Sequence, residues 1–214
     1  MDIILIYDDK YKEYAQITEQ SIREHNKNAK IHRIESVPDE FIKEFIGIDN
    51  NLHPTNICYA KLFIQDLLPD LDKVLYLDTD LIIRDSLEEL YNIPFDGNYI
   101  VGCESHDYSK KQAKELNIPK YLNSGVMLLD LKAMRENKVS EYLRANFKPL
   151  VDKVSIWIYD ETIINGLLHN KIKFVSEKWN YCVNRQYAYR EVTEPKVLHY
   201  IGGDKSGMLK WQKQ

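Results

Sequence analysis

This sequence of 214 residues has few of the features that mark membrane spans, disulfide frameworks or nucleic-acid-binding surfaces. No apolar run approaches the roughly 20 residues that a membrane-spanning helix needs. The three cysteines, Cys58, Cys103 and Cys182, are odd in number and widely spaced. This argues against a disulfide framework or a structural zinc site and favours a reducing compartment. The net charge of −4 disfavours a sequence-independent nucleic-acid binder, because such proteins are normally basic.

Low-complexity stretches and targeting signals are missing as well. Eight glycines and seven prolines are too few for a low-complexity segment. The first residues lack the basic segment and long apolar stretch of a signal peptide, so we expect a cytoplasmic location. With 44% hydrophobic residues, the composition is that of a globular protein. The length predicts one compact domain over residues 1–214, which is either the whole protein or one domain of a longer one with further domains beyond residue 214.

Strands and helices are expected to alternate along the chain. The apolar, β-rich runs at 2–7 and 74–77 are typical of strands buried on both faces of a parallel sheet. Helical spacing runs from Tyr11 to about His25, and a second helix is expected after Pro54-Thr55. Further strands are expected at 30–35, 99–103, 126–129, 171–175 and 197–200, and further helices at 41–46, 87–91, 139–148 and 160–169. This alternation predicts an α/β domain with a mostly parallel central sheet flanked by helices.

Two acidic segments follow the buried strand runs. Ligands in such folds bind at the carboxyl ends of strands. The segments at these ends are Asp8-Asp9-Lys10 and Asp78-Thr79-Asp80. At i and i+2 on an extended chain, Asp78 and Asp80 point to the same side, and their repulsion is relieved by a divalent cation. A turn in which the aspartates cap a loop is the alternative. The long, lysine-rich segment 104–119 is expected to be a mobile flap.

Five segments resemble those of glycosyltransferase family 8, which includes glycogenin and bacterial lipopolysaccharide galactosyl- and glucosyltransferases, and they occur in the family's order. These segments are Ile6-Tyr7-Asp8-Asp9-Lys10-Tyr11, Lys73–Tyr91 around Asp78-Thr79-Asp80, Tyr121–Asp130, Tyr159–Asn165 and His199–Lys205. Trp179-Asn180-Tyr181 also resembles a family segment behind the donor site. The resemblance implies a GT-A fold, which is a Rossmann-like nucleotide-sugar-binding domain. It also implies metal-dependent transfer of a hexose or deoxyhexose from a UDP-sugar to an acceptor hydroxyl on a glycan or glycoprotein.

The resemblance implies that Asp78, Asp80 and His199 are the metal ligands. Two carboxylate oxygens and one imidazole nitrogen suit Mn²⁺ better than Mg²⁺, which prefers an all-oxygen shell; Mg²⁺ stays open. The alternative for His199 is a histidine that merely ends a strand.

The remaining donor-site residues are carried over from the same segments. Asp8 would accept a hydrogen bond from the uracil N3–H, and Tyr11 would stack on the base. Asn123 would bind hydroxyls of the donor sugar, and Lys205 would place an ammonium at the diphosphate. Each also has a structural alternative, such as a tight turn at 8–11, an Asn-Ser-Gly turn at 123–125 or a flexible tail around Lys205. Further residues implied at the nucleotide-sugar are Ile6, Tyr7, Lys61, Thr79, Gly125 and Gly202.

Two departures from the family bear on the chemistry. Lys61 stands where the family commonly has arginine, which keeps the charge but loses the bidentate fork. Glu161 follows Asp160 where the family has Asp-Gln, although Asp160, Glu161 and Asn123 are still expected to orient or attack the donor sugar. The resemblance implies retention of the anomeric configuration. Three alternatives stay open for Glu161: it acts as a nucleophile, it acts as a general base in an inverting reaction, or its side chain points away from the site.

Two other functions remain as alternatives to a glycosyltransferase. One is a UDP-sugar hydrolase or a non-catalytic nucleotide-sugar-binding module, which would keep the donor site without a productive acceptor site. The other is a non-catalytic interaction domain with no nucleotide site. Binding of UDP would exclude the interaction domain. Release of free sugar at a rate that does not depend on acceptors would favour the hydrolase over the glycosyltransferase.

Overall fold

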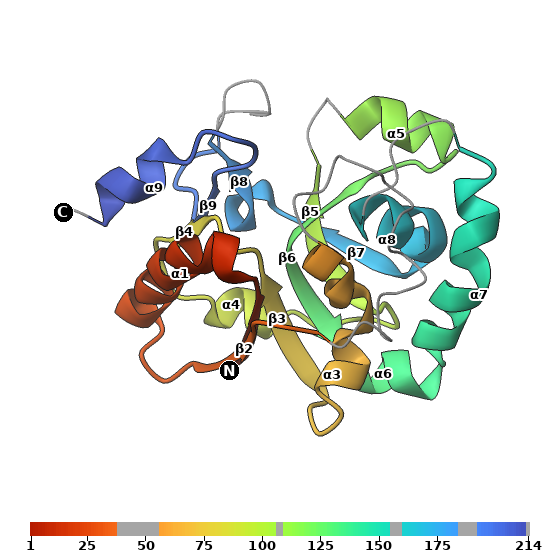
Figure 1. The fold of residues 1–214 in the computed structure, drawn as a ribbon, viewed down its shortest axis with the longest axis horizontal. Coiled ribbons are helices and arrows are strands. Elements are labelled where there is room, and N and C mark those ends of the chain that lie inside the picture. Colours follow the sequence, from red (N-terminus) through yellow and green to blue (C-terminus); the bar gives the residue numbers. More distant parts are fainter. Residues whose placement is uncertain (38–55, 106–108, 155–159, 184–191, 213–214) are drawn as a thin grey trace.

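A computed structural model describes residues 1–37, 56–105, 109–154, 160–183 and 192–212 (Figure 1). The expected helix at 41–46 lies outside the described residues. No helix in these ranges is long and apolar enough to cross a membrane.

The central sheet has six strands in the order β2-β1-β3-β6-β5-β7. The strands are β1 (Asp2–Ile6), β2 (Lys30–Ile34), β3 (Lys73–Leu77), β5 (Ile100–Glu104), β6 (Leu122–Asp130) and β7 (Ile172–Val175). Strand β1 is parallel to β2 and β3, and β5 is parallel to β7, so the expected mostly parallel sheet is confirmed. Strand β6 is antiparallel to both β3 and β5.

The reversed direction of β6 positions a segment of the candidate site. Leu77 at the end of β3 pairs with Val126. The first residues of β6, 122–125, therefore lie at the edge where β1 and β3 end. The backbone N–H of Asp78 donates to the carbonyl of Gly125 at 2.8 Å, which joins two of the expected donor-site segments directly.

Helices flank the sheet at most of the expected places. They are α1 (Lys12–His25), α3 (Ile64–Leu67), α4 (Glu88–Tyr91), α5 (Lys110–Glu115), α6 (Leu131–Glu136), α7 (Val139–Val151), α8 (Asp160–Leu168) and α9 (Ser206–Trp211), with 3₁₀ turns η1 (Asp9–Tyr11), η2 (Asn56–Phe63), η4 (His169–Lys171) and η5 (Glu177–Trp179). The helix expected after Pro54-Thr55 is 3₁₀ as far as Phe63. Segment 104–119 includes α5, so the expectation of an all-loop flap was wrong in that part.

The sheet separates two apolar cores (Figure 1). Residues such as Ile4, Tyr76 and Met127 point to one face and pack against η2, α6, α7 and α8. Their neighbours along the same strands point to the other face and pack with α1, α4 and Trp179. Because successive strand residues alternate between the faces, strands buried on both sides need the continuous apolar runs that the sequence contains.

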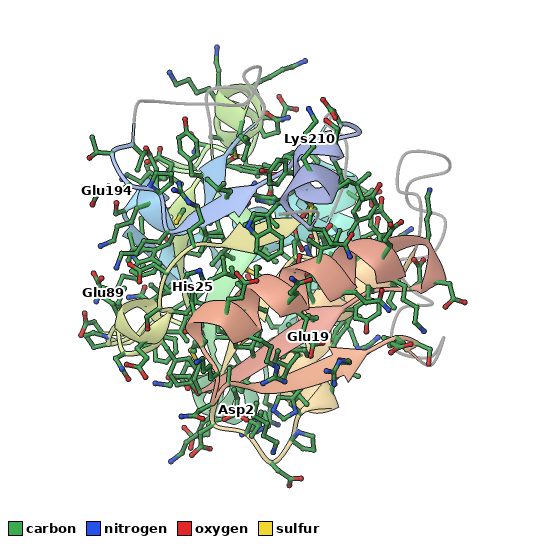
Figure 2. All side chains as sticks on the ribbon, turned by 90° about the vertical axis from the view of Figure 1, so that its left-hand side faces the viewer. Asp2, Glu19, His25, Glu89, Glu194 and Lys210 are labelled. Atoms are coloured by element: carbon green, nitrogen blue, oxygen red, sulfur yellow. The ribbon has the colours of Figure 1, made fainter. Side chains whose placement is uncertain are left out.

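A second, three-stranded sheet extends the site edge. Its order is β4 (Leu81–Ile83), β9 (Val197–His199) and β8 (Tyr181–Cys182). Leu81 pairs with His199, so a histidine near the end of the chain lies beside the Asp78-Thr79-Asp80 segment. In Figure 2, α1, which includes Glu19, lies beneath the C-terminal helix with Lys210, and Ile17 packs against Met208 between them.

Helix α1 also supports the acidic segment through a buried hydroxyl. Thr18 Oγ1 lies 2.8 Å from the carbonyl oxygens of both Thr79 and Leu81. The backbone N–H of Leu81 donates to the same hydroxyl at 3.2 Å. Since Thr18 is fully buried, these bonds form in a low-dielectric environment and hold the Asp78–Asp80 turn against the helix.

Candidate functional site

Three side chains with metal-ligand chemistry meet at the edge shared by the two sheets. Asp78, Asp80 and His199 each offer one ligand atom, and these atoms all lie within 4.8 Å of one another. His199 Nε2 is 3.1 Å from Asp80 Oδ1 and 3.8 Å from Asp78 Oδ2. The imidazole is buried, whereas the carboxylates are partly exposed. Two carboxylate oxygens and one nitrogen at this spacing fit a divalent cation with open positions for a ligand.

Each carboxylate of this cluster has its second oxygen held by a lysine. Lys61 Nζ lies 3.2 Å from Asp78 Oδ1, and Lys205 Nζ lies 2.6 Å from Asp80 Oδ2. The Tyr76 hydroxyl also donates to Asp78 Oδ1. These bonds leave Asp78 Oδ2 and Asp80 Oδ1 directed at His199. Burial alone would raise the pKa of Asp80, but the His199 imidazole and the Lys205 ammonium outweigh it and hold the pKa below its usual value.

Lys61 links the acidic cluster to the expected sugar end of the site. Its ammonium is 2.9 Å from Asp160 Oδ2 as well as 3.2 Å from Asp78 Oδ1, and Ser124 Oγ is 3.4 Å away. Only 7% of Lys61 is exposed, so the charge is enclosed. Burial would lower its pKa, but Asp160 and Asp78 raise it well above the usual value. Lys61 therefore compensates two carboxylates that would otherwise repel each other.

The first turn of α8 presents Asp160 and Glu161 to one residue of β6. Ser124 Oγ donates to Asp160 Oδ2 at 3.2 Å, and the Ser124 backbone N–H donates to Glu161 Oε2 at 3.0 Å. Asn165, one turn further along α8, accepts from the Leu122 N–H and donates to the Leu122 carbonyl. This clamp attaches α8 to the start of β6, so both carboxylates face Ser124.

The environment of Glu161 favours a proton on its carboxyl group. Burial is the main cause and raises the pKa to about 7, the Ser124 N–H lowers it, and neighbouring Asp160 raises it further. A carboxyl group that titrates near neutral pH is suited to general acid–base chemistry. Of the three roles left open for Glu161, the contact of its side chain with the backbone of Ser124 disfavours the one in which it points away from this segment.

The expected uridine edge follows β1 directly. Asp8 caps η1, with Oδ1 accepting from the Lys10 N–H at 3.1 Å. Burial raises the pKa of Tyr11, and the negative charge of Asp80 raises it further. Ile6 and Tyr7 are buried in the two cores, and the Tyr7 hydroxyl donates to Glu35 at 3.2 Å. Both side chains are therefore engaged in core packing, and the Tyr7 hydroxyl in the bond to Glu35.

Gly125 is needed for a reason that the sequence did not indicate. A Cβ atom there would lie 2.3 Å from His199 Cε1, 2.8 Å from His199 Nδ1 and 3.0 Å from Asp78 Oδ2. The His199 imidazole thus occupies the space that a side chain at position 125 would need. Gly202 has φ of +86°, a left-handed conformation that favours glycine between His199 and Lys205. Thr79 is buried and faces α1 through its carbonyl.

Replacing Gly125 with alanine is expected to displace the His199 ring and weaken divalent-cation binding by about 10-fold or more, the loss typical of a disturbed ligand orientation. Titration of Mn²⁺, followed by the electron paramagnetic resonance of the free ion, measures this affinity. Gly203→Ala is the matched control, because nothing lies within 4 Å of its Cβ position. Equal Mn²⁺ affinity in Gly125→Ala and wild type would contradict the packing argument.

Four residues that contact the site had no role assigned to them from the sequence. Tyr76 lies two residues before Asp78 on β3, so the two-residue period of a strand would have found it. Ser124 and Thr18 have no such signal, because their partners are distant in sequence. Asn180, in the segment that resembles the family, lies 2.8 Å from His199.

Comparison with known proteins finds a matching family model and similar sequences. A sequence model of Glycosyl transferase family 8 matches residues 2–206. General stress protein A of Bacillus subtilis is 23% identical over 188 residues, which cover 76% of this chain and 65% of that protein. A lipopolysaccharide 1,2-glucosyltransferase of Escherichia coli is 26% identical over 220 residues, which cover 92% of this chain and 61% of that protein. The chain thus spans less than two thirds of the length of these relatives.

A solved structure shows the same architecture. The galactosyltransferase LgtC, crystallised with donor and acceptor sugar analogues, superposes with a TM-score of 0.82 at 21% identity. The match covers 100% of this chain and 94% of that one. At this identity the likeness establishes the fold, and the expected GT-A fold is confirmed.

Proposed function

Since the chain belongs to glycosyltransferase family 8, we propose that it transfers a hexose or deoxyhexose from a UDP-sugar to an acceptor hydroxyl on a glycan or glycoprotein. The observation that carries the proposal is the meeting of Asp78, Asp80 and His199 at the strand ends, next to Asp160 and Glu161. We further propose that residues 1–214 form one GT-A domain. The two acidic groups and His199 come from distant parts of the chain. Their convergence supports a donor site with a diphosphate end at the Asp78–His199 cluster and a sugar end at Asp160.

Asp78, Asp80 and His199 would hold a divalent cation, with Mn²⁺ favoured by the mixed oxygen and nitrogen set. The close fit of His199 over Gly125 supports this reading, because it aims a ring nitrogen between the two carboxylates. When bound, the cation supplies charge that stabilises the departing UDP.

The protein groups around the cluster complete the donor site. Lys205, which is held at Asp80 by its ammonium, would extend to the diphosphate and add positive charge there. Asp8 and Tyr11, at the end of the neighbouring strand, would bind the uridine. Asn123 and Asp160 would orient the donor sugar, since both lie beside Ser124 at the other end of the cluster.

Calorimetric titration of UDP into the protein, first with Mn²⁺ and then with excess chelator, tests the proposal. We expect heat of binding with Mn²⁺ and its loss with chelator. If UDP binds in neither condition, the interaction-domain alternative replaces the proposal. Metal-dependent binding justifies screening UDP-sugars and then acceptors.

Hydrolysis of the UDP-sugar is the second candidate, and Glu161 is the observation that favours it. A carboxyl group with a pKa of about 7 beside the sugar end is suited to activating water. Release of free sugar at the same rate with and without candidate acceptors would favour the hydrolase. Acceptor-dependent consumption of the donor would favour the transferase.

A further inference from the structure

We propose that Asn123 and Asn180 form a relay that fixes the proton of His199 on Nδ1 and leaves Nε2 as the ring nitrogen that faces the cation. The inference rests on the proposed metal-binding function and assigns its positioning residues. All three side chains are buried, with 7%, 5% and 3% of Asn123, Asn180 and His199 exposed. Their hydrogen bonds therefore form away from bulk water, where a wrong donor–acceptor pairing is costly.

The polarity of the relay begins at a backbone group that can only donate. The Gly125 N–H lies 3.1 Å from Asn123 Oδ1, so this amide must present its oxygen. The same oxygen lies 2.7 Å from Asn180 Nδ2. Because an amide oxygen only accepts, Asn180 must turn its NH₂ group toward Asn123.

The orientation of Asn180 then determines the tautomer of His199. With its NH₂ engaged by Asn123, Asn180 presents Oδ1 to His199 Nδ1 at 2.8 Å. An oxygen there requires a hydrogen on Nδ1. When a cation occupies the cluster, a neutral imidazole with its proton on Nδ1 directs toward that cation the lone pair of Nε2, the atom that lies 3.1 Å from Asp80 Oδ1.

The backbone around Asn180 keeps the amide in place. Its N–H donates to the Glu177 carbonyl at 3.0 Å at the end of η5. The next residue, Tyr181, begins β8, which pairs with β9 so that Cys182 is opposite His199. The relay therefore joins two neighbouring strands of the small sheet to the start of β6. Metal-binding histidines commonly donate their second ring N–H to such a partner, and losing it costs 10–100-fold in metal affinity.

Nuclear magnetic resonance of ¹⁵N-histidine-labelled protein tests the tautomer without any enzymatic assay. The signals of His199 are assigned by their absence in His199→Gln. In metal-free wild type we expect a protected Nδ1–H. With ¹¹³Cd²⁺ as the probe ion, we expect the one-bond ¹¹³Cd–¹⁵N coupling on Nε2. Coupling on Nδ1 instead would overturn the relay.

Substitutions of the two asparagines supply the second readout. Asn180→Leu is expected to lose the Nδ1–H signal and to weaken Mn²⁺ binding by about 10–100-fold. Asn180→Asp should keep the signal, since a carboxylate oxygen also accepts from Nδ1–H. Asn123→Leu should weaken the signal, because Asn180 is then free to reverse its amide. Wild-type signal and Mn²⁺ affinity in Asn180→Leu would overturn the proposal.

Asn26→Leu is the matched control for the loss of a buried amide. Asn26 is 7% exposed and its Oδ1 accepts from the Leu87 N–H at 2.8 Å at the end of α1. The Asn26→Leu substitution should lower stability and leave both the His199 signal and the Mn²⁺ affinity unchanged. If wild type binds no divalent cation, the proposed function fails, while the metal-free spectrum of wild type and Asn180→Leu still decides the relay.

Discussion

Asn in place of Asp80 is expected to abolish cation-dependent UDP binding, with a loss of affinity of about 100-fold or more, or roughly 2.7 kcal/mol. The substitution keeps the shape of the side chain and removes its charge. Asp80 Oδ1 faces His199 and Oδ2 holds Lys205, so one change disturbs both the cation cluster and the lysine expected at the diphosphate. Calorimetry of UDP with Mn²⁺ present measures the loss.

The same variant has an expected effect on stability in the absence of metal. The pKa of Asp80 is lowered in the folded protein, so its ionised form stabilises the fold above the unfolded pKa of about 4. This contribution is lost as the pH falls through the folded pKa. Metal-free Asp80→Asn should therefore be less stable than wild type at pH 7 in urea unfolding, and the difference should shrink toward pH 3.

Asp85→Asn is the control for removing a carboxylate near this region. Asp85 is exposed, and its carboxylate pairs with Lys196 at 3.0 Å. An exposed pair of this kind contributes little, so UDP binding should be unchanged. Wild-type UDP affinity in Asp80→Asn with Mn²⁺ would refute the assignment of the metal ligand.

The strands at the site could be predicted from the sequence because their burial is written into local patterns. The apolar runs at 2–7 and 74–77 became neighbouring parallel strands, so the acidic segments after them lie at one edge. Strands β4 and β8 have three and two residues and no periodicity to detect. Their existence depends on pairing with β9, which lies far from β4 in the sequence.

The chemistry of the site was predictable by residue type, whereas its hydrogen bonding was not. Asp78, Asp80 and His199 meet as the resemblance implied. Lys61 was implied at the nucleotide-sugar by the resemblance alone. Its ammonium lies between Asp78 and Asp160, an arrangement that needs the packing of η2 against α8. Spacing along the chain contains no information about such three-way contacts.

Gln in place of Glu161 is expected to change both the stability and the pH dependence of the reaction. The pKa of Glu161 is raised from 4.5 to about 7 in the fold, so the folded protein holds this proton more tightly than the unfolded chain. Wild type therefore loses stability as the pH rises from about 5 to 8. Glu161→Gln lacks this loss and should be more stable by about 1–3 kcal/mol at pH 8, a range that allows for partial exposure of the side chain.

Activity is expected to respond in the opposite direction. Asp160 is engaged by the Lys61 ammonium, whereas Glu161 accepts a hydrogen bond from a neutral backbone N–H. If its carboxylate acts on the donor sugar or on an attacking hydroxyl, kcat/KM of wild type rises with pH through a limb near pH 7. Glu161→Gln should lose this limb and about 100-fold or more of the rate at pH 8.

The two readouts separate a chemical role from a merely structural one. The stability gain at pH 8 follows from burial of the carboxyl group alone, and it should appear whichever role Glu161 has. Asn165→Ala, which removes the clamp between α8 and β6, serves as a control that lowers stability at every pH. A Glu161→Gln variant that is more stable and also fully active would show that Glu161 only occupies the position of the family's glutamine. A more stable variant with a lost pH limb would instead identify its carboxylate as part of the reaction.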